Sequence, residues 1–298
     1  MSNTALETTG LGKRYRGRWA LEDCTISVPR GHVVGLVGPN GAGKSTMLNL
    51  AAGLISPSAG TISVLGEQPA RDAAQLARVG FVPQDAALYG WLSIEDHLRL
   101  GAHCNPAWDG TAAHARLAEL GLGARQRAGK LSGGQRAQLS LTIALAKRPE
   151  LLLLDEPVAS LDPLARREFL GLMMSTVAGH DVSIVLSSHL VSDIERVCDY
   201  LIVLVHSRVR VAGEIEELLA THHRLVGARS ADDAAPVNQT VIAASVTDRQ
   251  RLLVVRSDGP VVEPGWIIES VNLEDLVLAY MGQGAVRQDP LATVPVAS

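Results

Sequence analysis

A glycine-rich loop near the N-terminus has the residue types and spacing needed to hold a phosphate. The segment from Gly38 to Thr46 matches the pattern G-x-x-x-x-G-K-[ST]. Glycines allow consecutive backbone N–H groups to wrap around a phosphate without Cβ clashes. Lys44 can reach the outer phosphates of a nucleotide, and the Ser45 hydroxyl can bind Mg²⁺. The sequence therefore predicts a nucleotide site. GTP is disfavoured, because no N-K-x-D-like motif follows the loop.

A second candidate anion site lies at Leu131 to Arg136, which reads L-S-G-G-Q-R. Ser132 is placed to act as the N-cap of a following helix, and Gly133 and Gly134 expose backbone N–H groups at its N-terminus. Five fixed residues, Leu131 to Gln135, arise by chance less often than the pattern of the phosphate loop. We interpret this motif as an anion site that is separate from the first.

Two adjacent carboxylates follow an apolar run. The four leucines Leu151 to Leu154 predict a buried strand that delivers Asp155 and Glu156 at its C-terminal end. Ligands of open α/β sheets bind at that edge. Asp155 could hold a metal ion there, directly or through a water, and Glu156 could orient and deprotonate an attacking water.

The elements that must position these residues can be followed along the chain. Residues 4–30 favour short strands, because Cys24, Ile26 and Val28 alternate with polar neighbours. The apolar run from Val33 to Val37 predicts a buried strand before the phosphate loop, and a helix should begin at Lys44 and point its positive dipole end at the anion. The sequence thus predicts an α/β core.

The rest of the chain divides into segments of distinct character. Strand signals vanish over residues 88–148, which favours a helical subdomain inserted into the core. Residues 223–240 are predicted to be a linker, since much of this segment is polar and rich in Ala and Asp, with one proline. Residues 241–282 predict a small α+β extension whose final helix begins near Asn272. Residues 283–298 are predicted to be a disordered tail.

With its motifs in this order, the chain resembles the ATP-binding cassette (ABC) family over residues 4 to about 222. The resemblance implies a P-loop NTPase fold, with a RecA-like core, an antiparallel β subdomain and a helical subdomain, in a domain spanning residues 1–222. It implies ATP and Mg²⁺ as cofactors and ATP hydrolysis as the reaction. It also implies that Tyr15 stacks on adenine, although the nearby Trp19 is a rival for that contact.

The remaining site residues follow from the same resemblance. Gln84 matches the glutamine that touches Mg²⁺ and faces a transmembrane partner. The Ser160-Leu-Asp162 segment matches the loop that crosses a dimer interface, and His189 matches the switch histidine that contacts the γ-phosphate. Ser132 and Gly134 are implied to complete the site of a second copy of the chain, so that ATP joins two protomers.

The predicted site residues fall into three groups. The catalytic residues are Lys44, Gln84, Glu156 and His189. The metal ligands are Ser45, Gln84 and Asp155. The nucleotide-binding residues are Tyr15, Gly38, Pro39, Asn40, Gly41, Ala42, Gly43, Lys44, Ser45, Thr46, Ser132, Gly133, Gly134, Gln135 and Asp162.

Composition restricts the class of protein further. The chain has 298 residues and a formal net charge of −4, which gives no electrostatic reason to expect a nucleic-acid partner. No apolar run approaches the length of a membrane helix, and no signal peptide is apparent. Three scattered cysteines suit a reducing cytoplasm. A metal cluster of His97, His103, Cys104 and His114 is disfavoured, because the spacing fits no common site.

Among ABC proteins, we expect the motor subunit of a two-component exporter of the ABC-2 group, held at the cytoplasmic face of the plasma membrane by a separate permease chain. The stretch from Asn272 to Tyr280 resembles the ending typical of that group. An importer motor is the first alternative. A soluble ABC protein acting on DNA or ribosomes is the second. It is disfavoured because no heptads split the cassette, only one cassette is present, and no basic patch is evident.

Overall fold

The computed structural model describes residues 3–159, 161–179, 182–228, 239–247, 249–261 and 264–282. The chain consists of two compact units, Met1–Ala212 and Gly213–Ser298. All of the predicted site residues belong to the first unit.

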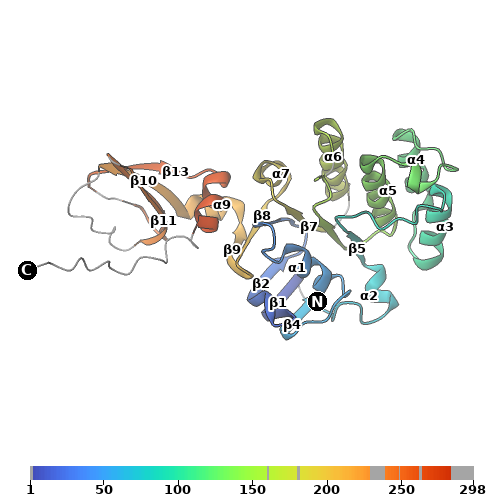
Figure 1. Ribbon diagram of the computed structural model, residues 1–298, viewed down its shortest axis with the longest axis horizontal. Coiled ribbons are helices and arrows are strands. Elements are labelled where there is room, and N and C mark those ends of the chain that lie inside the picture. Colours follow the sequence, from blue (N-terminus) through green and yellow to red (C-terminus); the bar gives the residue numbers. More distant parts are fainter. Residues whose placement is uncertain are drawn as a thin grey trace, which may run out of the picture. The chain divides into compact units, whose positions relative to one another are not determined.

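The first unit is built around a six-stranded sheet in the order β5-β6-β7-β3-β8-β9 (Figure 1). Its strands are β3 (Val33–Val37), β5 (Val79–Val82), β6 (Leu151–Asp155), β7 (Ser183–Ser188), β8 (Tyr200–Val205) and β9 (Arg208–Glu214). The pairs β5–β6, β6–β7, β7–β3 and β3–β8 are parallel. Every residue of β3, β6, β7 and β8 is buried. Strands that are buried on both faces carry continuous apolar runs, which is why β3 and β6 could be predicted from the sequence.

Three helices follow the central strands. The phosphate loop connects β3 to α1 (Lys44–Ala51), while α6 (Pro163–Gly179) and α7 (Val191–Val197) follow β6 and β7. Helix α1 packs against β6, and α7 packs against β7 and β3. Each helix therefore begins on the edge of the sheet where its strand ends.

An antiparallel sheet in the order β2-β1-β4 completes the core of the first unit. Its strands are β1 (Thr4–Tyr15), β2 (Arg18–Pro29) and β4 (Ala59–Val64). Cys24, Ile26 and Val28 of β2 are buried, in agreement with the alternation of the sequence. They share one hydrophobic core with residues of β3, α1, β6 and β8.

The segment between β5 and β6 is helical. It contains α3 (Ile94–Cys104), α4 (Gly110–Glu119), the 3₁₀ turn η1 (Ala128–Lys130) and α5 (Gly133–Ala146), while the short helix α2 (Ala73–Ala77) precedes β5. Ile94, Leu117 and Leu139 belong to a separate hydrophobic core of this segment. The predicted fold class, a P-loop α/β core with an antiparallel β subdomain and an inserted helical region, is confirmed by these elements.

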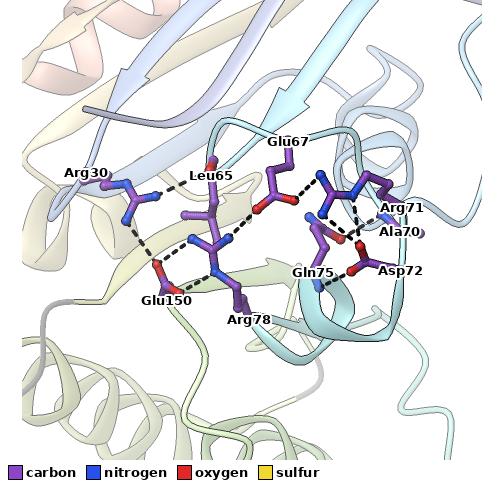
Figure 2. A network of polar contacts seen from close by, with 9 residues as sticks. All are labelled: Arg30, Leu65, Glu67, Ala70, Arg71, Asp72, Gln75, Arg78 and Glu150. Atoms are coloured by element: carbon purple, nitrogen blue, oxygen red, sulfur yellow. Dashed lines mark hydrogen bonds and ion pairs between the residues drawn. The ribbon is translucent and has the colours of Figure 1, made fainter. Parts of the chain in front are cut away.

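A network of charged side chains joins the two sheets at the N-terminal ends of β5 and β6 (Figure 2). Glu150 accepts hydrogen bonds from Arg30 Nη1 at 3.0 Å and from Arg78 Nη2 at 2.9 Å. Arg78 Nη1 also donates to Glu67 Oε1 at 2.8 Å. The hydrogen bonds from Arg78 are the main cause of a lowered pKa for Glu150. Charged contacts thus tie β2 and the loop after β4 to the strand ends opposite the predicted site.

The second unit contains a four-stranded antiparallel sheet in the order β11-β12-β10-β13. Its elements are α8 (Ile215–Thr221), β10 (His222–Ala228), β11 (Thr240–Val246), β12 (Gln250–Arg256), β13 (Trp266–Ser270) and α9 (Leu273–Gly282). Leu225, Leu253 and Val255 form its buried core. The final helix begins as expected, because Asn272 Oδ1 accepts a hydrogen bond from the Asp275 N–H at 2.7 Å.

The predicted linker is wrong at its start. Residues 222–228 form β10, which pairs with β12 on one side and β13 on the other. Composition could not reveal this, because the strand is fixed by partners that follow later in the chain. The boundary between the units accordingly lies at Ala212 and Gly213, earlier than the predicted domain end at 222. The predicted linker residues 229–238 and the predicted tail 283–298 lie outside the described residues.

This boundary predicts how truncated chains behave. A chain that ends after Glu214 keeps β9 and removes the second sheet, so we expect a monomer that melts cooperatively and binds ATP. A chain that ends after Gly227 keeps β10 without β12 and β13, which exposes Leu225 and two unpaired strand edges. We expect that chain to aggregate. Light scattering after size exclusion measures the mass of each truncated chain. If the two chains are equally monomeric, the boundary between the units is wrong.

Candidate active site

Three neighbouring strands deliver the predicted chemistry to one edge of the sheet. In the order β6-β7-β3, the carboxyl ends are followed by the acidic pair, by His189 and by the phosphate loop. A cavity of about 510 Å³ opens at this edge. The predicted residues that line it are Tyr15, Asn40, Gly41, Gly43, Lys44, Ser45, Thr46, Gln84, Glu156 and His189.

The phosphate loop is packed so tightly that two of its glycines have no room for a side chain. A Cβ on Gly38 would lie 2.1 Å from the Leu204 carbonyl oxygen, and one on Gly43 would lie 2.3 Å from the Ala20 carbonyl oxygen. Gly43 is also the N-cap of α1 with φ 111°, a left-handed conformation that glycine adopts without strain. Gly41 has open space around it. The loop is therefore held firmly from behind and open toward the cavity.

Lys44 and the carboxylate of Glu156 meet in this cavity. The Lys44 side chain is only 5 % exposed, and its Nζ donates to the Gly38 carbonyl at 2.9 Å. The same Nζ lies 3.3 Å from Glu156 Oε1, and His189 Nδ1 lies 3.3 Å from Glu156 Oε2. The structure thus brings three of the four predicted catalytic residues into direct contact, with the Glu156 carboxylate between two basic side chains.

The backbone of Glu156 adopts an unusual conformation. Its φ is 46°, in the left-handed region, which costs a residue with a Cβ about 1–2 kcal/mol. The Glu156 N–H donates to the Ser187 hydroxyl at 2.8 Å. The same hydroxyl donates to Asp155 Oδ1 at 2.8 Å. Ser187 is not among the site residues predicted from the sequence. Its contact with the acidic pair depends on the register of β7 against β6, which no local signal in the sequence reveals.

The three predicted metal ligands offer a hydroxyl, an amide and a carboxylate oxygen. Ser45 and Gln84 line the cavity. Asp155 is 4 % exposed at the end of β6, and its bond to Ser187 uses Oδ1, which leaves Oδ2 for another partner. An all-oxygen donor set with one carboxylate is what Mg²⁺ accepts in nucleotide sites. The residues that are present therefore fit this ion.

The second anion motif forms the N-terminus of α5. Ser132 caps the helix as predicted: its hydroxyl accepts from the Gln135 N–H at 3.2 Å, and Gln135 Oε1 accepts from the Ser132 N–H at 3.0 Å. A separate cavity of about 450 Å³ lies beside this helix end. Gly133, Gln84 and Glu156 are among its lining residues. Neither Ser132 nor Gly134 lines the cavity at the phosphate loop.

Two further predicted site residues, Asp162 and Tyr15, differ in their position relative to the cavities. Asp162 lies outside both cavities and caps α6, where its Oδ1 accepts from the N–H groups of Leu164 and Ala165 at 3.0 Å each. Ser160, the other polar residue of that motif, lies outside the described residues. Tyr15 is 47 % exposed and lines the phosphate cavity, whereas Trp19 lies outside it beneath the guanidinium of Arg14.

The histidines of the helical region bind local groups. His97 Nδ1 lies 2.7 Å from the Ser93 carbonyl, and its Nε2 accepts from the Tyr89 N–H at 3.0 Å. His114 Nε2 lies 3.0 Å from Glu95 Oε2. Within the described part of the chain, no group of three or more His, Cys, Asp or Glu side chains could hold a metal ion.

Comparison with known proteins places these motifs in a family. The family model "ABC transporter" matches residues 21–159. The chain is 35 % identical over 221 residues to the uncharacterized ABC transporter ATP-binding protein YxlF of Bacillus subtilis, covering 72 % of each chain. It is 34 % identical to the cobalamin import ATP-binding protein BtuD of Halobacterium salinarum, covering 82 % of this chain and 64 % of the relative. It is 35 % identical to the Nod factor export ATP-binding protein I of Sinorhizobium fredii, covering 73 % of this chain and 65 % of the relative.

Solved structures share the fold of the first unit. An ATP-binding subunit of an ABC transporter superposes with a TM-score of 0.66 at 32 % identity, over 73 % of this chain and 92 % of the other. The dimeric cassette MJ0796 superposes with a TM-score of 0.63 at 23 % identity, over 70 % of this chain and 98 % of the other. With the phosphate loop, the acidic pair and the capped helix in their expected positions, the chain belongs to the ATP-hydrolysing, ATP-binding subunits of ABC transporters.

Proposed function

We propose that this chain is the motor subunit of a two-component exporter, and that it couples ATP hydrolysis to movements of a separate membrane subunit. The observation that carries the hydrolytic role is the contact of Glu156 with both Lys44 and His189 in the phosphate cavity. Export is supported by the stretch from Asn272 to Tyr280, which resembles the ending typical of exporter ATPases, and by the likeness to the Nod factor export protein.

Import is the second candidate. The cobalamin import protein BtuD matches 82 % of this chain, more than the 73 % matched by the Nod factor export protein. A soluble role on DNA or ribosomes has no such support. The test is to purify the chain together with its membrane subunit and to assay transport in inverted vesicles, whose cytoplasmic face is on the outside. An exporter would move cargo into these vesicles when ATP is added, and an importer would move cargo out of them.

The site residues have distinct proposed roles in the reaction. The backbone of the phosphate loop and the Lys44 ammonium bind the phosphates, and Tyr15 stacks on the adenine. Ser45, Gln84 and Asp155 hold Mg²⁺, which supplies charge neutralisation on the phosphate oxygens. Glu156 orients a water and accepts its proton, because its carboxylate lines the cavity. His189, which lines the same cavity, contacts the γ-phosphate.

A second copy of the chain is proposed to complete the site. Ser132 and Gly134 lie at a helix N-terminus that exposes backbone N–H groups, but they line no part of the phosphate cavity of their own chain. Contact with the phosphates of a partner would give this motif a ligand. The loop that contains Asp162 would then lie at the dimer interface. The dimeric form of MJ0796, which shares the fold, supports this arrangement.

The membrane subunit is proposed to bind beside Gln84. A groove of about 370 Å³ separates the core from the helical region, with Phe81, Pro83, Leu88 and Leu100 among its lining residues. Exposed aromatic side chains extend this surface: Tyr89 is 54 % exposed and Trp91 is 72 % exposed. Among the described residues, no helix has the length and apolar character to cross a bilayer. A subunit bound here would hold the chain at the cytoplasmic face of the membrane.

The assignment of Tyr15 predicts a selective loss of ATP affinity. Tyr15→Ala should weaken ATP binding roughly 5- to 150-fold, since aromatic stacking on a base contributes about 1–3 kcal/mol. Trp19→Ala is the matched control, because Trp19 is an exposed aromatic on the same hairpin but lies outside the cavity. Its affinity should stay within about twofold of wild type. Titration with a fluorescent ATP analogue measures both variants. A larger loss for Trp19→Ala would reverse the assignment.

The proposed roles of Glu156 and Ser132 predict a trapped dimer. Glu156→Gln keeps size and hydrogen bonding but removes the base, so ATP should bind without being hydrolysed and should hold two chains together. Adding Ser132→Arg should abolish the dimer while ATP binding to the monomer survives. Light scattering after size exclusion, with and without Mg²⁺ and ATP, measures the mass. A double variant that still dimerises would exclude the second anion motif, Leu131 to Arg136, from the interface.

The proposed docking surface predicts a loss of assembly without a loss of ATP binding. Trp91→Ala should weaken binding of the membrane subunit by roughly tenfold or more, because exposed aromatics at interface centres contribute heavily. Its ATP affinity should match wild type. The Trp19→Ala chain again serves as the control and should copurify with the membrane subunit normally. Undiminished copurification of Trp91→Ala would move the docking surface elsewhere.

A further inference from the structure

A single buried hydroxyl holds both members of the acidic pair. Ser187 lies on β7 directly beside Asp155 of β6 in the parallel register, and its side chain is 0 % exposed. Its Oγ donates to Asp155 Oδ1 and accepts from the Glu156 N–H, each at 2.8 Å. No other side chain in the described part of the chain contacts both a carboxylate of this pair and the backbone between them.

The contact falls where the strand ladder ends. Asp155 is the last residue of β6 that pairs with β7, and the next residue turns into the left-handed region with φ 46°. In this turn the Glu156 N–H donates to a side chain of β7 instead of a main-chain carbonyl. A left-handed turn at a residue with a Cβ persists only where its surroundings hold it. The Ser187 hydroxyl is such a support.

The turn decides where the carboxylate of Glu156 lies. From this turn the Glu156 side chain reaches two basic groups: its Oε1 lies 3.3 Å from Lys44 Nζ, and its Oε2 lies 3.3 Å from His189 Nδ1. An extended or right-handed backbone at the same residue would direct the side chain elsewhere. The conformation of one peptide unit therefore aims the carboxylate at the cavity.

We propose that Ser187 is a positioning residue for ATP hydrolysis. Its hydroxyl holds Glu156 in the left-handed turn that aims the carboxylate into the cavity, and holds the Asp155 carboxylate by Oδ1. Ser187 does not line the cavity, so it acts through these two neighbours. The inference rests on the proposed role of Glu156 as the group that activates water.

The chain offers a matched control on the same strand. Ser183 is 2 % exposed, and its hydroxyl accepts from the Gly31 N–H at 2.9 Å. It precedes Ser187 by four residues, so it lies about 13 Å away at the opposite end of β7. Replacing either serine by alanine removes one buried hydroxyl and leaves one backbone N–H without that partner. Only Ser187 is connected to the acidic pair.

The test compares Ser187→Ala, Ser183→Ala and wild type as full chains. We expect Ser187→Ala to lower kcat roughly 10- to 100-fold with KM for ATP changed less than about threefold, because the reacting groups are misplaced while the phosphate loop is intact. Ser183→Ala should keep kcat within about twofold, although both variants lose a similar amount in melting temperature. Ser187→Thr, which restores the hydroxyl on a residue suited to strands, should recover most of the lost kcat.

A crystal structure of Ser187→Ala gives a readout that does not depend on activity. We expect Glu156 to leave the left-handed region in that variant and to keep it in Ser183→Ala. A wild-type kcat for Ser187→Ala, an unchanged φ at Glu156, or an equal loss of kcat in Ser183→Ala would each overturn the proposal. Glu156→Gln distinguishes failure of the proposed role of Ser187 from failure of the proposed role of Glu156. If it is inactive while Ser187→Ala turns over normally, only the role of Ser187 fails. If Glu156→Gln turns over normally, the proposed role of Glu156 fails as well.

Discussion

Parallel pairing of β6, β7 and β3 is the constraint on which the rest of the structure depends. Strands that run in the same direction end on the same edge, so residues separated by more than a hundred positions meet there. Lys44, Glu156 and His189 follow three different strand ends, and both Lys44 and His189 contact the Glu156 carboxylate. Loss of the register between any two of these strands would separate the groups, whatever the sequence of the loops.

Burial of both faces makes this sheet rigid, and a charged network fixes its opposite edge. All residues of β3, β6, β7 and β8 are buried, so the strands cannot shift without opening the core. At their N-terminal side, Glu150 and Arg78 tie the start of β6 to the start of β5 and to the antiparallel sheet. The reactive edge can therefore be open to ligands while the opposite edge carries the connections that stabilise the sheet.

Much of this arrangement could be predicted from the sequence, because its signals are local. The phosphate loop, the buried run before Asp155 and the Ser132 cap each depend on residues within about a dozen positions of one another. Features that depend on distant partners could not be predicted. Strand β10 is fixed by β12 and β13, which follow it in the chain. The choice between Tyr15 and Trp19 as the aromatic that stacks on adenine also depends on the folded chain, because only Tyr15 lines the phosphate cavity. The bridge through Ser187 likewise required the register of β6 against β7.

Two residues of the first unit belong to two cavities at once. Gln84 and Glu156 line both the cavity at the phosphate loop and the cavity beside the N-terminus of α5. Ligands that contact the same pair of side chains would influence each other, because each one would fix or displace a wall of the other's site. Thermodynamic linkage then makes the effect mutual: if occupation of one cavity raises affinity at the other by some factor, the reverse holds by the same factor. Any coupling between ligands of the two cavities would thus pass through this shared wall rather than over a distance.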